Sequence, residues 1–222
     1  GVVERAYNLG WDHVPVCRML EERFHVPCRL SNDANCAALA EQVAGAAVGH
    51  DNVVLITLGT GVGGGVIVNG KVIEAGHMLL VLDGEPCTCG RRGCWEAYSS
   101  ATALIRQARQ AAAEHPESLL AGAEEITGKT VFDAADRGDE TANAVVDRFC
   151  DYLGAGVTNI VNALAPEVIL IGGGISRQGE RLLAPVRRYV EKNCFGGKDG
   201  AIPIIAAARL GNDAGIIGAA AL

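Results

Sequence analysis

The sequence predicts an α/β protein whose second half forms a largely parallel sheet. Two mainly apolar segments, 53–58 and 167–171, have the length and the β-branched content of buried strands, and each leads directly into glycines. Helical patterns lie between and after these runs, which is the order expected of strands joined by crossover helices. With 222 residues, the chain is long enough to bury a sizeable core.

The first half of the chain begins with a predicted helix. Asp12 is placed as its N-cap, the helix ends near His25, and Val16, Leu20 and Phe24 recur on one face. The elements that follow are short and are expected in this order: a strand at 27–30, a polar turn at 31–35, an alanine-rich helix at 37–47, a buried strand at 53–58, a glycine loop at 59–65, and an apolar run at 66–68 that ends at the hairpin signal Asn69-Gly70.

The second half is predicted to be helical from residue 101 to residue 165. Apolar side chains recur at helical spacing from Val145 to Leu164, and Pro166 ends that helix. The expected elements are, in order, a helix at 101–114, short helices within 116–138, a long helix at 140–165, a strand at 167–171, a glycine turn at 172–174, a helix at 176–192, a strand at 202–206 and a terminal helix after Asp213.

Charge and hydropathy exclude several classes of partner. The formal charge is −7 and no cluster of Lys and Arg stands out, which argues against nucleic-acid binding by this portion. No apolar run reaches the length of about 18 residues that a membrane span needs, and the start does not resemble a signal peptide. We expect a cytoplasmic protein without a membrane partner. Because the chain opens on Gly1 without a methionine, we also expect a missing N-terminal portion.

Two strands run directly into glycine loops, Gly59-Thr60-Gly61 after the first and Gly172-Gly173-Gly174 after the second. Glycine permits positive φ and lets backbone N–H groups approach an anion closely, so both loops are candidate phosphate contacts. Neither loop matches the P-loop or the dinucleotide fingerprint. A tight structural turn is the alternative for each.

Asp33 lies between a short strand and a helix, in the segment Asn32-Asp33-Ala34-Asn35. One interpretation is an N-cap for that helix. The other is catalytic, because a carboxylate that faces a phosphate-binding loop can accept the proton of an attacking hydroxyl group.

Three of the eight cysteines, Cys87, Cys89 and Cys94, lie within eight residues of one another. Their spacing suits three corners of a tetrahedral zinc site, and His77 lies ten residues upstream as a fourth ligand. Four protein ligands leave no position for water, so such a site is structural. The alternative is a disulfide plus spare thiols. The other five cysteines stand singly among apolar neighbours and are expected to behave as small buried hydrophobes.

Six motifs follow one another along the chain: Asn8-Leu9-Gly10-Trp11, Asn32-Asp33-Ala34-Asn35, the run from Leu58 to Gly65, Glu74-Ala75-Gly76-His77, the run from Cys87 to Glu96, and Ile171-Gly172-Gly173-Gly174-Ile175. They have the order found in the ROK family of bacterial repressors and sugar kinases, and the chain resembles that family over essentially its whole length. The resemblance implies an actin-like ATPase (ribonuclease H-like) fold with two lobes and a zinc knuckle.

The resemblance also implies a role for each matching residue. Asp33 would be the catalytic base, with Asn32 beside it as a sugar ligand. The other roles are sugar binding by Glu74, His77 and Glu96, contact with ATP phosphates by Thr60 and Gly61, lining of the nucleotide cleft by Gly172 and Gly173, and zinc binding by His77, Cys87, Cys89 and Cys94.

The implied activity is phosphorylation of a hexose by ATP and Mg2+, with glucose and its 6-hydroxyl as the expected acceptor. The alternative is a sugar-responsive transcriptional repressor whose DNA-binding region lies outside this chain. The family's N-terminal Asp-x-Gly-Gly-Thr segment is absent here. We therefore expect residues 1–32, together with the terminal helix 212–222, to be a remnant of the small lobe, and residues 33–211 to form the large lobe. A homodimer is expected from the same resemblance.

Overall fold

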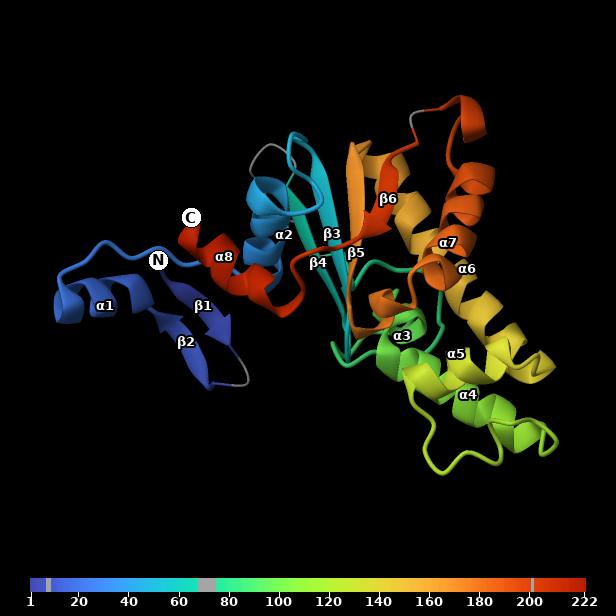
Figure 1. The fold of residues 1–222 in the computed structure, drawn as a ribbon. Coiled ribbons are helices and arrows are strands. Elements are labelled where there is room, and N and C mark those ends of the chain that lie inside the picture. Colours follow the sequence, from blue (N-terminus) through green and yellow to red (C-terminus); the bar gives the residue numbers. More distant parts are fainter. Residues whose placement is uncertain (7–8, 68–74, 201) are drawn as a thin grey trace.

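The computed structural model describes residues 1–6, 9–67, 75–200 and 202–222. Its centre is a four-stranded sheet of order β4-β3-β5-β6 (Figure 1). The strands are β3 (Val53–Leu58), β4 (Val62–Ile67), β5 (Val168–Gly173) and β6 (Ile204–Ala207). β4 runs antiparallel to β3, whereas β3, β5 and β6 are parallel. The predicted α/β class and the parallel second half are confirmed.

Helices cover both faces of this sheet (Figure 1). The helices of one face are α6 (Glu140–Leu164) and α7 (Glu180–Asn193), and those of the other are α2 (Asp33–Ala44) and α8 (Ala214–Ala220). Alternate residues of β3 divide between two apolar clusters: Ile56 belongs to the cluster that contains α6, and Leu55 packs with Ala38 of α2. Both faces of β3 are therefore buried, as its sequence predicts, in which Thr57 is the one polar residue.

Further helices lie beside α6 and around the candidate site. They are α3 (Glu96–Ser99), α4 (Ala101–Glu114) and α5 (Gly128–Asp136), and short 3₁₀ turns are η1 (Gly174–Gln178), η2 (Gly197–Asp199) and η3 (Gly211–Asp213). The helices expected at 101–114, at 140–165 and after Asp213 are confirmed. The helix expected at 176–192 is instead divided into η1 and α7, because Gly179 interrupts it with a positive φ of 56°. The hairpin signal at 69–70 falls outside the described residues.

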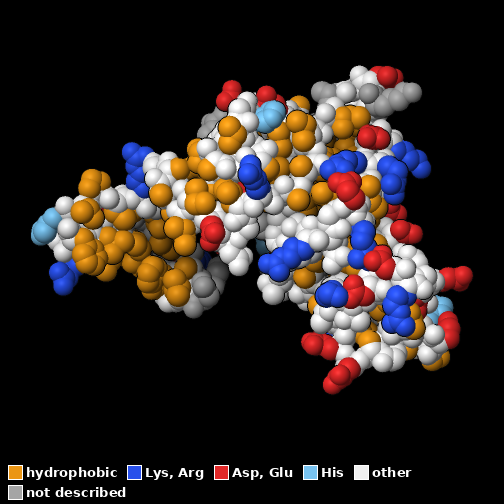
Figure 2. Space-filling model, in the orientation of Figure 1, with side chains coloured by type: hydrophobic (Ala, Val, Ile, Leu, Met, Phe, Trp, Pro, Cys, Tyr) orange, Lys and Arg blue, Asp and Glu red, His pale blue; other side chains and the backbone are white. Residues whose placement is uncertain are grey.

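The first residues form a separate small unit of β1 (Val3–Ala6), β2 (Trp11–Val14) and α1 (Val16–Phe24). α1 ends at His25 as predicted, but the N-cap prediction for Asp12 is wrong because that residue pairs in β2. The strand expected at 27–30 is irregular backbone. Leu20 and Phe24 are 39% and 60% exposed, and Figure 2 shows apolar side chains gathered over this unit.

α2 begins four residues earlier than predicted. The side-chain oxygen of Asn32 accepts hydrogen bonds from the backbone N–H groups of Ala34 (2.8 Å) and Asn35 (3.4 Å), so the polar segment 31–35 caps and starts the helix. The glycine loop is also shorter than the predicted 59–65, because Gly63 to Gly65 belong to β4. A Cβ atom on Gly65 would collide with the carbonyl group of Ala34. Glycine in β4 thus allows α2 to lie directly on the strand.

α2 and α8 are joined at two points. A Cβ atom on Gly218 of α8 would collide with the backbone carbonyl of Cys36. Farther along α2, the fully buried carboxylate of Glu41 accepts N–H hydrogen bonds from Ala46 (2.8 Å) and from the segment before α8, at Arg209 and Leu210 (2.7 Å each). These contacts hold the last helix of the chain against the helix that begins at Asp33.

Replacing Gly218 with Ala should lower the free energy of unfolding by about 2–3 kcal/mol, because the added methyl group meets backbone that no side-chain rotation can move. Gly215→Ala in the same helix is the matched control, since a Cβ atom there meets nothing within 4 Å. That control should be neutral or stabilising by about 0.5–1 kcal/mol. Urea denaturation followed by circular dichroism measures both; equal stability of the two variants would contradict the described packing of α2 on α8.

Four of the five isolated cysteines, Cys17, Cys36, Cys150 and Cys194, are buried, as predicted, whereas Cys28 is half-buried. Burial raises the pKa of Cys150 to about 12, which keeps that thiol protonated at neutral pH. Among the helices that the structure describes, none combines the length and apolar character that a membrane crossing requires.

Candidate functional site

An open cleft of about 390 Å³ lies where β3 and β5 end. Its residues come from the start of α2, the first glycine loop, the start of β4, the segment before α3, α3 itself and the end of β5: Asn32, Asp33, Ala34, Thr57, Gly59, Thr60, Gly61, Val62, Gly63, Gly64, His77, Glu96 and Gly173. The carboxyl ends of neighbouring strands in an α/β sheet are the usual place for a ligand.

Asp33 is the first residue of α2 and is exposed at this cleft. Its carboxylate accepts a hydrogen bond from the N–H of Ala34 at 2.8 Å, and a negative charge is favourable at a helix N-terminus. The N-cap alternative applies to Asn32 rather than to Asp33. The carboxylate of Asp33 therefore starts the helix and still faces the open cleft.

The two glycine loops lie side by side because Leu58 of β3 pairs with Gly173 of β5. Gly173 has a φ of 85°, and a Cβ atom there would collide with the backbone of Leu58, so the position requires glycine. The first loop is held from the start of α4: the N–H of Ala101 donates to the Gly59 carbonyl, and the Thr102 hydroxyl donates to the Thr60 carbonyl, both at 2.8 Å. Both loops are thus fixed and open on the cleft.

Glu96 connects the first glycine loop to the cysteine-rich segment. One carboxylate oxygen accepts the N–H of Val62 at 3.0 Å, and the other accepts the hydroxyl of Thr88 at 2.9 Å and lies 3.5 Å from the sulfur of Cys87. A Cβ atom on Gly61 would collide with this carboxylate. The glycine therefore makes room for a carboxylate at the edge of the cleft.

Beside the cleft, one ring nitrogen of His77 and the sulfur atoms of Cys87, Cys89 and Cys94 all lie within 4.8 Å of one another. The Cys89 and Cys94 sulfurs are 3.6 Å apart, and the Cys87 sulfur is 3.5 Å from Nδ1 of His77. A tetrahedral zinc ion with ligand bonds near 2.3 Å needs roughly 3.8 Å between ligand atoms. The four side chains therefore have the donor chemistry and the spacing to hold a metal ion.

The electrostatics of this cluster are unequal. Hydrogen bonds with Arg91 lower the pKa of Cys89 to about 6, whereas burial raises the pKa of Cys94 to about 12. The guanidinium of Arg91 also donates to the backbone carbonyl of His77 at 2.8 Å. Without a metal ion, one thiolate and one thiol thus lie side by side, and a bound ion would displace the remaining protons.

Two further cavities flank the second glycine loop. One, of about 430 Å³, lies between the sheet and the α2–α8 pair and is lined by Glu41, Arg209 and Asn212 as well as Gly172 to Gly174. The other, of about 650 Å³, continues from Gly59 and Thr60 toward α5 and η1, where its lining includes Leu58, Ala101, Lys129, Phe132, Asp133, Ile175 and Gln178. No sequence motif predicts the larger cavity, because the residues that α5 contributes to it belong to none.

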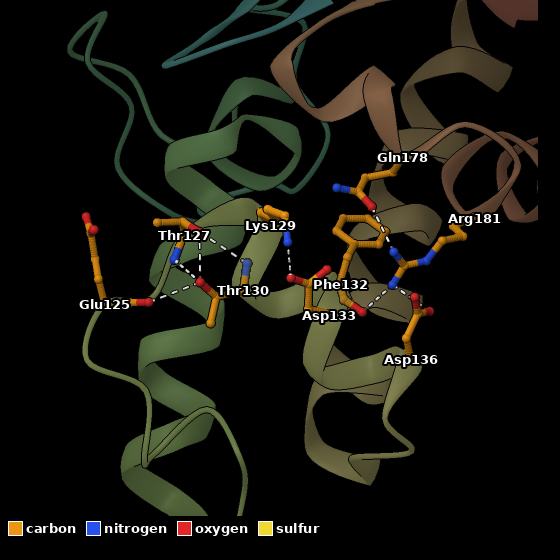
Figure 3. A network of polar contacts seen from close by, with 9 residues as sticks. All are labelled: Glu125, Thr127, Lys129, Thr130, Phe132, Asp133, Asp136, Gln178 and Arg181. Carbon is orange, nitrogen blue, oxygen red and sulfur yellow. Dashed lines mark hydrogen bonds and ion pairs between the residues drawn. The ribbon is translucent and has the colours of Figure 1, made fainter.

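A network of polar contacts fixes one wall of the larger cavity (Figure 3). The guanidinium of Arg181 donates to the Phe132 carbonyl and to the side-chain oxygen of Gln178 (3.0 Å), and forms an ion pair with Asp136 at 2.6 Å. It also lies 5.2 Å from the centre of the Phe132 ring. Arg181 therefore ties α5 to η1, while Lys129 pairs with Asp133 at the cavity.

The structure brings together most of the residues singled out in the sequence. The predicted sugar and base residues Asn32, Asp33, His77 and Glu96 line one cleft with Thr60, Gly61 and Gly173, and Gly172 lines the adjoining cavity. His77 belongs both to this cleft and to the cysteine cluster. Glu74 lies outside the described residues. The roles assigned to all these residues stay predictions.

The fold and the cleft define an α/β protein of the actin-like ATPase class. The sequence model of the ROK family matches residues 1–222, and the chain belongs to that family. It is 44% identical to a glucokinase of Halalkalibacterium halodurans over 98% of this chain and 70% of that protein.

Two further relatives show the range of the family. The crystal structure of a ROK family glucokinase from Streptomyces griseus in complex with glucose and AMPPNP has a TM-score of 0.84 and 38% identity, over 100% of this chain and 76% of that one. The xylose repressor of Bacillus spizizenii is 31% identical over 85% of this chain and 48% of that protein. Kinases and repressors thus share this fold.

Proposed function

We propose that the protein is an ATP-dependent hexose kinase that transfers a phosphoryl group to the 6-hydroxyl of glucose. The observation that carries this proposal is the cleft in which the exposed carboxylate of Asp33 and two glycine loops face a common space. The similarity to glucokinases at 44% and 38% identity supports ATP and glucose as the two substrates.

In this proposal Asp33 is the base. The carboxylate would accept the proton of the attacking hydroxyl group and hold that oxygen in line with the phosphoryl group. Asn32 uses its side-chain oxygen to cap α2, so its amide N–H groups are the part left for a sugar hydroxyl. Glu96 and His77 lie on the other wall, where they would bind sugar hydroxyls by charge-assisted hydrogen bonds.

The nucleotide would lie along the glycine loops. Thr60 and Gly61 are placed to contact phosphates, and Gly172 and Gly173 line the adjoining space. The cavity of about 650 Å³, with apolar walls from Leu58, Phe132 and Ile175, has the size and the character for a nucleoside. Mg2+, bound with the triphosphate, would neutralise charge on the transferred group.

The cysteine cluster would hold a structural Zn2+ ion. Three thiolates and one imidazole complete a tetrahedral sphere, so no position is left for water. Because Nδ1 of His77 faces Cys87 at 3.5 Å, Nε2 is the nitrogen that would remain for a sugar hydroxyl. The metal would then fix the ring of His77 and, through Cys87 and Thr88, the carboxylate of Glu96.

The division into lobes, the oligomeric state and the location are parts of the same proposal. Residues 1–32, with 212–222, would belong to a small lobe and 33–211 to the large lobe. The exposed apolar side chains of α1 and its hairpin support this division, since a lone two-stranded hairpin is marginally stable and needs further packing. The membership of the ROK family supports a homodimer, and the use of ATP supports a location in the cytoplasm.

A coupled assay of ADP release tests the function. The full-length protein with Mg-ATP and a panel of hexoses should release ADP with glucose at a kcat of about 1–100 s⁻¹, as is usual for kinases. Glucose phosphorylated at the 6-hydroxyl should be the product seen by NMR, and a glucose analogue without that hydroxyl is the control. Release of ADP that does not depend on any sugar would contradict the proposal.

A sugar-responsive repressor is the second candidate. The observation that favours it is the 31% identity to a xylose repressor, of which the chain covers 48%. A repressor would bind sugar in the same cleft without turnover and would need a DNA-binding region outside residues 1–222. The same assay separates the candidates, because sugar binding by calorimetry without ADP release would favour the repressor.

A further inference from the structure

Arg177 lies on η1, between the two cavities that flank the second glycine loop. It is exposed and lines both the cavity of about 430 Å³ and the cavity of about 650 Å³. Within the described parts of the chain, its guanidinium has no hydrogen-bond or ion-pair partner. A cation without a partner thus stands beside the loop that the proposed function assigns to the nucleotide.

The residues on either side of Arg177 are held in place. The hydroxyl of Ser176 donates to the Gly173 carbonyl at 2.8 Å, and the side chain of Gln178 accepts a hydrogen bond from Arg181 at 3.0 Å. Arg181 is in turn anchored by Asp136 and by the Phe132 carbonyl (Figure 3). The backbone of η1 is therefore fixed, and the Arg177 side chain is left free to contact a ligand.

The distribution of charge favours a phosphate as that ligand. The cleft that holds Asp33 and Glu96 has no Lys or Arg among its described lining residues. In the larger cavity Lys129 is already paired with Asp133, and Arg209 lines only the smaller cavity. A triphosphate that enters between these loops needs positive charge, and a guanidinium matches the geometry of phosphate oxygens.

We propose that Arg177 binds the phosphate groups of the nucleoside triphosphate at the second glycine loop. This assignment rests on the proposed kinase function and adds a cationic side chain to the second glycine loop. Arg177 would anchor the donor phosphates while Asp33 acts on the sugar hydroxyl across the cleft. Because the contact is to phosphates, it would be the same for any nucleobase.

Steady-state kinetics of Arg177→Ala and Arg177→Lys test the assignment. For Arg177→Ala, KM for ATP and KM for GTP should both rise about five- to tenfold, the loss of one partly exposed charge-assisted contact. KM for glucose and the preference for ATP over GTP should stay unchanged. Arg177→Lys should recover part of the loss, because it keeps the charge but not the planar fork.

Arg188→Ala is the matched control, since Arg188 is exposed on α7 and lines neither cavity. It should leave every constant as in the wild type. A KM for ATP that is equal in Arg177→Ala and Arg188→Ala would overturn the assignment, and so would a change in the ATP-to-GTP preference, which would mean a nucleoside contact.

Calorimetry separates this inference from the proposed function. Mg-ATP binding should weaken about five- to tenfold in Arg177→Ala, whether or not the protein phosphorylates a sugar. If the wild type shows no kinase activity with any hexose, the proposed function fails while weaker Mg-ATP binding by the variant still supports the phosphate contact. A wild-type protein that binds no Mg-ATP would overturn both.

Discussion

Asp33→Asn should lower kcat by about 10³-fold, the typical contribution of a positioned general base. KM for glucose and KM for ATP should change little, because the amide has the size of the carboxylate and can still accept a hydrogen bond from the N–H of Ala34. Steady-state kinetics with glucose and Mg-ATP measure the effect. Circular dichroism should show an unchanged fold, since Asn32 rather than Asp33 caps α2.

The control for this substitution is Asp51→Asn. Asp51 is exposed just before β3, at the opposite end of the strand from the glycine loop. Asp51→Asn changes the net charge by the same amount as Asp33→Asn and should leave kcat unaltered. If Asp33→Asn retained full turnover, the carboxylate would not be the base, and another group in the cleft would have to accept the proton.

Cys89→Ser should release the metal ion and lower the free energy of unfolding by about 4 kcal/mol, as expected when a structural metal is lost. Cys89 is exposed, so the substitution itself leaves no cavity in the core. KM for glucose should rise by about tenfold or more, because His77 and Glu96 both depend on the cysteine segment for their positions. Elemental analysis should fall from about one zinc per chain to none.

Cys28→Ser is the matched control for the metal site. Cys28 is half-buried and lies outside the cluster of His77 with Cys87, Cys89 and Cys94. It should keep both the metal ion and the KM for glucose. A wild-type protein that is native and free of metal would contradict the zinc assignment, whatever the behaviour of the cysteine variants.

The central sheet could be predicted because the apolar composition of its strands indicates that they are buried. β3 and β5 are continuous apolar runs that end in glycine, and Pro166 marks the end of α6. The starts of helices were harder. Asp12, the predicted N-cap, lies in a strand. Asn32 caps α2, and the helix begins four residues before the start that local propensity predicts, because contacts with β4 stabilise its first turn.

The candidate cleft was predictable where a motif carried it and unpredictable where packing did. Asp33, His77 and Glu96 stand in recognisable segments and meet at one cleft. Phe132 and Arg177 belong to no motif. Their position beside the glycine loops depends on how α5 and η1 pack, and Arg181, which is 49 residues from Phe132 in the sequence, stabilises that packing. A single sequence contains no local signal for such a contact.

The contact of α2 with the end of the chain has a consequence for synthesis. The buried carboxylate of Glu41 accepts a hydrogen bond from the N–H group of Arg209, which is synthesised 168 residues later. At about 5–20 residues per second, a ribosome needs on the order of ten to thirty seconds to add those residues. During that time the helix that begins at Asp33 lacks its partner α8. α2 can therefore be covered only after residues 209 to 220 have been translated, and a nascent chain stalled before residue 209 should expose α2 to proteases.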